Sequence, residues 1–442
     1  MIIQRLLAAC CMLLLALLLL PASLSAQEKI ISGKITDSKD GSPVTGASVV
    51  PKGSGNVTSS GQDGSYRLII SGSAKVLAFS SVGYINQEID IGEQTVINVV
   101  LAPSNIDLFI GGRAIPWEYG KPARSFLLQN DGAGKFIDVT AAMLPGIDPG
   151  FVTAAVWYDL NKDGYTDLLL CSEWGGIVAY INNKGSYIKK MLTEKKGWWN
   201  FLLPVDIDQD GDIDQDGDID LVAGNLGLNS RLKASPEQPV RLYYNDFDDN
   251  GKKEQVLSYY VQGKEIPFAS KADLDKQLPG LVKKKFLMGE KFASATMEEL
   301  FTADKLKSAV LLTADYFSNA ILINDGKLNF RVQSLPWEAQ LSCYRDAVVV
   351  EANGDSLPDL LLGGNFYENT IEMGRYDADY GLLLLNRGKG NFECATLNGL
   401  AIKGQVRHIR PVKLKQETAY ILARNNDSTR VIRFRKPGHR SP

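Results

Sequence analysis

Short runs in which apolar and polar residues alternate fill most of the chain, and this period of two predicts strands rather than helices. Between Ile30 and Leu101 the runs are separated by Gly, Ser, Asn and Asp, which favour turns. About seven runs in roughly seventy residues are typical of a small antiparallel sandwich. We therefore expect a β-sandwich over residues 27–103.

After Pro103 the pattern changes to acidic loops between apolar strands. The segments Ile106–Phe136 and Pro358–Phe392 repeat the same order, in which Asp107 aligns with Asp359. Each unit runs strand, acidic loop, strand, glycine turn, strand, hairpin, strand. Four-stranded units spaced about 35 to 50 residues apart predict a β-propeller of about six to eight blades, seven preferred. The fold class is thus all-β, with the propeller over residues 104–442.

Two further features concern the completeness of this propeller. The first unit begins at Asp107, where its acidic loop should end, so we expect a C-terminal strand to complete that blade and close the ring. The repeat is interrupted over residues 268–306, where Ser270–Asp273 and Thr296–Glu299 have the spacing of helix capping boxes. We expect two short inserted helices there, either as a structural insert or as a lid over one propeller face.

The N-terminal segment has an apolar run from Leu6 to Leu20, then Pro21 and small residues up to Ala26. This pattern predicts a secretory signal peptide over residues 1–26, with a retained membrane anchor as the alternative. After cleavage no apolar run is long enough to span a bilayer. We expect an exported protein in the periplasm, on the outer-membrane surface or outside the cell.

Composition excludes several kinds of site. A net charge of −3 argues against a nucleic-acid partner. With only two histidines, His408 and His439, zinc sites built on histidine and Ser-His-Asp catalysis are nearly excluded. The three cysteines after the signal segment cannot form a complete disulfide framework, so stability must come from a core or from bound metal.

The acidic loops have oxygen-bearing side chains at their first, third, fifth and ninth positions, and most have glycine at the sixth. Calcium requires six to eight oxygen ligands at short range, which alternating residues of a tight loop supply. The sixth residue favours glycine because it needs a positive φ. Such segments are also good hairpin turns, but their recurrence favours Ca²⁺. The candidate ligands are Asp159, Asn161, Asp163 and Asp167; Asp206, Asp208, Asp210, Asp212, Asp214, Asp216 and Asp220; Asp246, Asp248, Asn250 and Glu254; and Glu351, Asn353, Asp355 and Asp359.

Two of these loops depart from the simple pattern. The loop Glu351–Asp359 has Ser356 in the glycine position, which makes it the weakest copy. The stretch Asp206–Asp220 contains eight aspartates and repeats the hexapeptide DQDGDI. One ion with the additional hexapeptide bulged outward is the preferred interpretation. Two ions bridged by Asp214 are the alternative.

Two family resemblances accompany these patterns. The segments GKITDSKDGSPVTGASV, GQDGSYRL and LAFSSVGY resemble the carboxypeptidase-regulatory-like domain, which implies a transthyretin-like sandwich common at the N-termini of exported and outer-membrane proteins of the Bacteroidetes type. The later blocks DLVAGNLGLNS, LPWEAQLS, GGNFYEN, GRYDADYGLLLLN and GQVRHIR resemble FG-GAP/VCBS-type repeat proteins related to cartilage acidic protein. This second resemblance implies a calcium-stabilised binding or adhesion scaffold.

The expected function is therefore non-catalytic binding of a glycan or protein partner. Exposed tryptophans would stack on sugar rings, whereas buried ones would only fill contacts between blades; the candidates are Trp117, Trp174, Trp198, Trp199 and Trp337. A polysaccharide lyase or hydrolase is the alternative, although no pair of carboxylates outside the loops has a spacing that indicates catalysis. A structural subunit of an outer-membrane assembly is a third interpretation.

Overall fold

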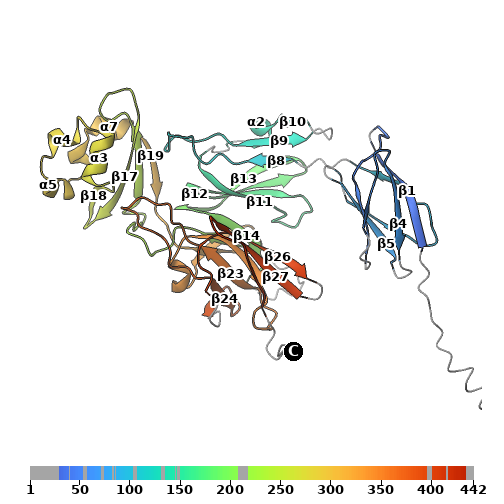
Figure 1. Cartoon of the computed structure of the whole chain (residues 1–442). Coiled ribbons are helices and arrows are strands. Elements are labelled where there is room, and N and C mark those ends of the chain that lie inside the picture. The colour runs from blue at the N-terminus through green and yellow to red at the C-terminus, as the bar shows by residue number, and fades with distance from the viewer. Residues whose placement is uncertain are drawn as a thin grey trace, which may run out of the picture. The chain divides into compact units, whose positions relative to one another are not determined.

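The computed structural model describes residues 29–38, 40–52, 57–70, 74–81, 84, 86–102, 107–130, 135–144, 146, 150–207, 218–395, 401–414 and 417–434. The predicted signal segment and the seam at Pro103 lie outside these residues. The chain forms two compact units, one of residues 1–107 with 129–137 and one of residues 108–128 with 138–442. Both consist mainly of small β-sheets, as Figure 1 shows.

The N-terminal strands form two sheets around one core. The sheets have the orders β4-β1-β7 and β3-β2-β5-β6, and their core includes Ile31, Val49, Leu68 and Phe79. The alternation in the sequence is visible in β4, where every second residue is buried. One pairing differs from the expected antiparallel sandwich, because β1 and β7 are parallel. The strands are β1 (Lys29–Asp37), β2 (Ser48–Pro51), β3 (Thr58–Ser59), β4 (Ser65–Ile70), β5 (Val76–Ser80), β6 (Gln87–Asp90) and β7 (Val99–Leu101).

The rest of the chain forms further small sheets in the orders β10-β9-β8, β11-β12-β13, β14-β15-β20-β21, β22-β23-β24-β25 and β26-β27-β28. A one-turn helix, α2 (Thr140–Met143), follows β10. The strands are β8 (Leu108–Ile110), β9 (Phe126–Asn130), β10 (Phe136–Asp138), β11 (Val152–Tyr158), β12 (Asp167–Asn183), β13 (Ser186–Trp198), β14 (Phe201–Val205), β15 (Asp220–Gly224), β20 (Ala320–Asn324), β21 (Phe330–Ser334), β22 (Tyr344–Val350), β23 (Asp359–Gly364), β24 (Leu382–Asn386), β25 (Phe392–Ala395), β26 (Gln405–Leu414), β27 (Glu417–Asn425) and β28 (Arg430–Ile432).

The sheet of β22 to β25 has the complete unit expected from the repeat. An acidic loop joins β22 to β23, and β23 ends at Gly363–Gly364. A side chain at Gly364 would meet the carbonyl oxygen of Cys343 at 2.3 Å, so glycine is required by this close approach. The first strands of successive sheets are also neighbours, since β11 packs against β14, β14 against β22, and β22 against β26.

The insert is larger than the sequence predicted. A whole additional sheet, of order β18-β17-β16-β19, lies in the chain between β15 and β20, and it carries five short helices where two were expected. The predicted capping box at Thr296 is present, with both reciprocal bonds to Glu299. These elements are β16 (Val240–Asn245), β17 (Glu254–Val261), β18 (Lys264–Pro267), β19 (Val310–Ala314), α3 (Lys271–Gln277), α4 (Val282–Lys285), α5 (Gly289–Ala293), α6 (Met297–Leu300) and α7 (Ala303–Ser308).

The additional helices bury an apolar cluster that the sequence pattern did not predict. Leu274, Leu278, Val282, Phe292 and Leu300 are buried together against strands of the inserted sheet. Helices of four to seven residues bury too few positions to show a clear period of 3.6. The insert therefore has its own core.

The predicted ring closure by a C-terminal strand is wrong for the residues that the structure describes. There, β26, β27 and β28 form a sheet of their own, and none of them pairs with β8, β9 or β10. The pairing of β26 with β27 runs from Gln405–Asn425 to Leu414–Glu417. A long hairpin between adjacent segments closes with little loss of chain entropy, which favours it over pairing with a distant strand.

A buried carboxylate joins the second and third strands of the β22–β25 sheet. Asp379 accepts hydrogen bonds from the backbone N–H groups of Gly364 and Gly381, each at 2.9 Å. Its own backbone exchanges two hydrogen bonds with the side chain of Asn365. Burial raises the pKa of Asp379 to about 7, and the two N–H groups only partly oppose this effect.

Asp379 should therefore make stability depend on pH. The folded-state pKa of about 7 lies above the unfolded value of 3.8, so the folded form binds the extra proton between these values. Stability is then lost as the pH rises from about 4 to about 7, by up to roughly 4 kcal/mol. Asp379→Asn should remove this slope in urea unfolding, while Asp377→Asn, at an exposed position, should keep it. Equal slopes in the three proteins would contradict the assignment.

Candidate metal centres

The loop Asp159–Asp167 between β11 and β12 is held by its own acidic side chains. The carboxylate of Asp159 accepts from the backbone N–H groups of Asp163 and Gly164, at 3.1 and 2.8 Å. Asp163 accepts from the N–H of Tyr165 at 2.8 Å. Side chains at the first and fifth positions thus bend the loop toward its own centre.

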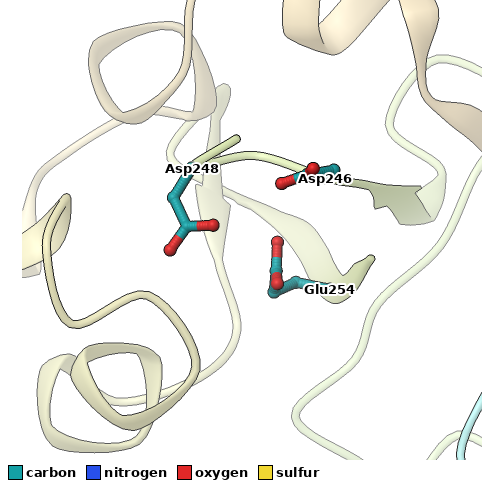
Figure 2. A group of neighbouring side chains, drawn as sticks. All are labelled: Asp246, Asp248 and Glu254. Carbon is teal, nitrogen blue, oxygen red and sulfur yellow. The ribbon is translucent and has the colours of Figure 1, made fainter. Parts of the chain in front are cut away.

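The loop Asp246–Glu254 in the inserted sheet brings three carboxylates together. Ligand oxygens of Asp246, Asp248 and Glu254 all lie within 4.8 Å of one another, and Figure 2 shows these side chains around a common space. No other group of three acidic, Cys or His residues in the described part of the chain is this close. Oδ1 of Asp248 is buried and has no hydrogen-bond partner. The three carboxylates could hold a metal ion, which would compensate the cost of a buried unpaired acceptor.

Lys305 of α7 partly neutralises this cluster from outside the loop. Its Nζ donates to the carbonyl oxygen of Asp246 at 2.6 Å and to the carboxylate of Asp249. The bond to Asp249 raises the pKa of Lys305, and its burial acts in the opposite direction. Asp249 is at the fourth loop position and its side chain is 81% exposed, so it lies outside the cluster of ligands.

The loop Glu351–Asp359, the weakest copy by sequence, shares the bond from the seventh residue to the fifth, while its first residue accepts from the fourth residue. Glu351 accepts from the N–H of Gly354 at 2.7 Å, and Asp355 accepts from the N–H of Leu357 at 2.9 Å. Ser356 takes the left-handed conformation expected for glycine, with φ 69°.

A shared backbone conformation explains why serine is tolerated there. In all three loops both the fourth and the sixth residues have positive φ: Lys162 and Gly164, Asp249 and Gly251, and Gly354 and Ser356. Each loop therefore has one glycine for two left-handed positions, and in the third loop the glycine stands at the fourth position. The spacing rule was too narrow, since it assigned positive φ to the sixth position alone.

The ninth residue of each loop is a buried carboxylate that closes the loop. It accepts from the backbone N–H of the second residue: Leu160 to Asp167, Phe247 to Glu254, and Ala352 to Asp359, at 2.9 to 3.1 Å. In two of these cases its second oxygen accepts from the backbone N–H of an asparagine: Asn182, near the far end of β12, to Asp167, and Asn386, at the end of β24, to Asp359. One carboxylate thus joins the loop to the start of the next hairpin.

Asparagines at the start of the hairpins take part in the same structure, which the spacing of the acidic loops did not predict. The side chains of Asn182, Asn324 and Asn386 donate to the carbonyl oxygen of the residue just before the closing acid. Each asparagine begins one of the repeated hairpins, so the signal was present as a repeat marker. The backbone N–H of Asn130 donates to the carboxylate of Asp107 at 3.1 Å, as the backbone N–H of Asn386 does to the carboxylate of Asp359. This confirms the alignment of Asp107 with Asp359.

In the duplicated stretch, Asp220 makes the bonds of a closing acid. Asp220 accepts from the N–H of Ile207 at 3.0 Å and from that of Asn324 at 2.8 Å, and Val205 pairs with Asp220 as Val350 pairs with Asp359. The flanking strands therefore hold Asp206–Asp220 as one loop with six additional residues. Asp208, Asp210, Asp212, Asp214 and Asp216 lie outside the described residues, and the number of ions there stays a prediction.

Electrostatics favour a cation at the closing acids. Burial raises the pKa of Asp167, Asp359 and Glu254, and neighbouring loop carboxylates raise it further, while backbone N–H groups oppose the shift. Asp167 and Asp359 are fully buried. A divalent ion would relieve both effects, and the carboxylate and amide oxygens of these loops are the ligands that Ca²⁺ prefers.

Comparison with known proteins identifies two modules in the expected order. Residues 31–108 match the CarboxypepD_reg-like domain, and residues 159–214 match the FG-GAP-like repeat. Over 80 residues the chain is 41% identical to TonB-dependent receptor P3 of Formosa agariphila, which is 18% of this chain and 8% of the receptor. Over 84 residues it is 44% identical to TonB-dependent receptor P26 of the same organism, which is 19% of this chain and 8% of that receptor. The chain thus matches less than a tenth of each relative.

Asp248→Asn should weaken binding of Ca²⁺ at the inserted sheet, because it removes one of three converging negative charges. We expect about a tenfold loss of affinity at that site, or about 1.4 kcal/mol, in calorimetric titration. Asp249→Asn is the matched control, since asparagine also accepts positive φ and the side chain does not face the cluster. Equal titrations for the parent protein and Asp248→Asn would contradict the site.

Gly354→Ala should lower stability by about 1–2 kcal/mol, because alanine is strained at the φ of 88° found there. Ser356→Gly should keep calcium binding, since glycine adopts the same conformation without strain. Gly280→Ala is the control, as its backbone is not left-handed and a methyl group would meet no atom within 4 Å. A Gly354→Ala protein as stable as the control in urea unfolding would rule out this conformational requirement.

Proposed function

We propose that the chain is an exported, non-catalytic binding scaffold, stabilised by Ca²⁺, that presents a propeller surface to a glycan or protein partner. The observation that carries the proposal is the common architecture of the acidic loops. In each described loop the carboxylates bond backbone N–H groups of the loop, and Asp167, Asp220 and Asp359 also bond the start of the next hairpin, which is a structural use of the acids. An ion bound there would hold strands together.

The sheet arrangement supports a propeller. The first strands β11, β14, β22 and β26 are neighbours in chain order, as innermost strands of successive blades are. The β22–β25 sheet is a consecutive four-stranded meander, and the β14–β21 sheet is the same meander with the insert between its second and third strands. The number of blades stays a prediction.

Export is supported by the N-terminal segment and by the relatives. The segment 1–26 has the sequence pattern of a signal peptide, and stretches of 80 and 84 residues of the chain are similar to proteins named as TonB-dependent receptors. In the part of the chain that the structure describes, no helix has both the length and the apolar character needed to cross a bilayer. We place the protein in the cell envelope or outside the cell; a structural role in an outer-membrane assembly is the alternative.

Two of the five candidate tryptophans are available to a partner. Trp117 is 97% exposed and Trp337 is 62% exposed. Trp117 also has φ 67°, a strained conformation for a bulky residue that its own packing does not explain. By contrast, Trp174 and Trp199 are buried, and Trp198 packs on Trp174 and Phe317. These three fill the interior.

A polysaccharide lyase or hydrolase is the second candidate function. Tyr119 and Glu173 are the candidate general acid and base for such an enzyme. Tyr119 donates to Glu173 at 2.8 Å and accepts from Trp174 Nε1 at 2.8 Å. Burial, and then the charge of Glu173, raises the pKa of Tyr119. A raised pKa disfavours the phenolate that a lyase base requires, and we therefore keep binding as the proposed function.

Glycan binding should depend on the exposed tryptophans. On a glycan array with Ca²⁺ present, Trp117→Ala or Trp337→Ala should reduce binding at least tenfold, because stacking on the indole is lost. Ile371→Ala is the matched control, as this residue is 97% exposed and not aromatic. Binding that survives both tryptophan changes would contradict this surface, and depolymerisation of any array ligand would favour the enzyme.

A further inference from the structure

Three arginines gather at the strand ends that lie opposite the acidic loops. In the β22–β25 sheet the loop joins Val350 to Asp359, whereas the other end of this pair is at Tyr344 and Gly364. Arg345 follows Tyr344 at that far end, and Arg407 is near the start of the neighbouring strand β26. This end of the sheets is therefore remote from the calcium ligands.

Two of these guanidinium groups share one aromatic ring. The centre of the Arg345 guanidinium lies 5.2 Å from the centroid of Phe366, and that of Arg407 lies 5.4 Å from it. A single ring offers only a weak counter-charge to two cations. An anion between or beside them would offset their repulsion.

One of the three arginines, Arg345, lacks a carboxylate partner within the described residues. Arg113 pairs with Glu173, and Nη2 of Arg407 is 3.8 Å from Glu368. Arg345 donates to the neutral amide oxygen of Asn200 at 2.6 Å, and within the described residues it has no carboxylate partner. Its Nε is buried and has no hydrogen-bond partner. A buried, unused N–H of a charged group indicates an acceptor that is supplied from outside the chain.

The electrostatics agree with this geometry. Burial lowers the pKa of Arg407, and the positive charges of Arg345 and Arg113 lower it further, against the effect of Glu368. The group stays charged because arginine titrates far above neutral pH. A second buried donor without a partner, Nε1 of Trp198, belongs to the same apolar cluster as Phe366.

We propose that Arg345, Arg407 and Arg113 form a binding site for an oxyanion, a carboxylate or sulfate group carried by an acidic glycan. The fork of a guanidinium matches the paired oxygens of both groups, and Phe366 holds two forks in place. The inference rests on the proposed glycan-binding function and narrows it to anionic polysaccharides. The two oxyanions share this chemistry, so the experiment must separate them.

The test measures binding of polygalacturonate, dextran sulfate and unmodified dextran by affinity electrophoresis and calorimetry, with Ca²⁺ present. Arg345→Gln and Arg407→Gln should each weaken binding of the preferred polyanion at least tenfold. Arg345→Lys keeps the positive charge but lacks the forked guanidinium, so this variant should retain only part of the parent protein's affinity for the polyanion. Arg430→Gln removes the same charge at an exposed position of β28 and should bind like the parent protein. Thermal unfolding checks that each variant is folded.

A second arm separates this site from the proposed function. Sulfate should raise the melting temperature of the parent protein above that in chloride at equal ionic strength, and this increment should disappear in Arg345→Gln. Should no glycan bind while sulfate still stabilises only the parent, the anion site stands and the glycan function fails. Equal binding of dextran and both polyanions, or equal losses in Arg345→Gln and Arg430→Gln, would overturn the site.

Discussion

The structure depends on a buried carboxylate at the end of each acidic loop. Asp167, Asp220 and Asp359 use one oxygen to hold the second residue of the loop and the other to hold the start of the next hairpin. A single ionisable group thereby sets the register between a loop and two strands. Taking it out of water is costly, and nearby loop acids add repulsion. Ca²⁺ in the loop would neutralise these carboxylates, offset the cost of burial and stabilise the contact between the strands.

Charge is separated along the sheets as a result. The acidic loops lie at one end of the first and second strands, and Arg113, Arg345 and Arg407 lie toward the other end. The net charge is only −3, so the acidic loops and the arginines are local concentrations of charge in a nearly neutral chain. If the loops bind metal and the arginines bind a ligand, as we propose, stabilisation and recognition use different side chains.

Much of this could be predicted from the sequence because it depends on local patterns. The strand repeat, the acidic loops and the alignment of Asp107 with Asp359 follow from alternation and spacing, and the structure confirms that alignment. What the sequence did not reveal depends on distant contacts: Lys305 beside Asp249, and the extra helices of the insert. The loop with Ser356 was considered the weakest copy because its sixth position lacks glycine. In the structure, Gly354 takes the other left-handed position of that loop.

Thermal unfolding of the purified protein in millimolar Ca²⁺ and in EDTA, with elemental analysis of the metal bound, tests the account most directly. An ion that binds only the folded form stabilises it by about 2.7 kcal/mol per site when its free concentration is a hundred times the dissociation constant. We therefore predict a melting temperature several degrees higher with Ca²⁺, and several equivalents of bound metal. Identical unfolding in both buffers, with no metal bound, would contradict a fold organised by cations.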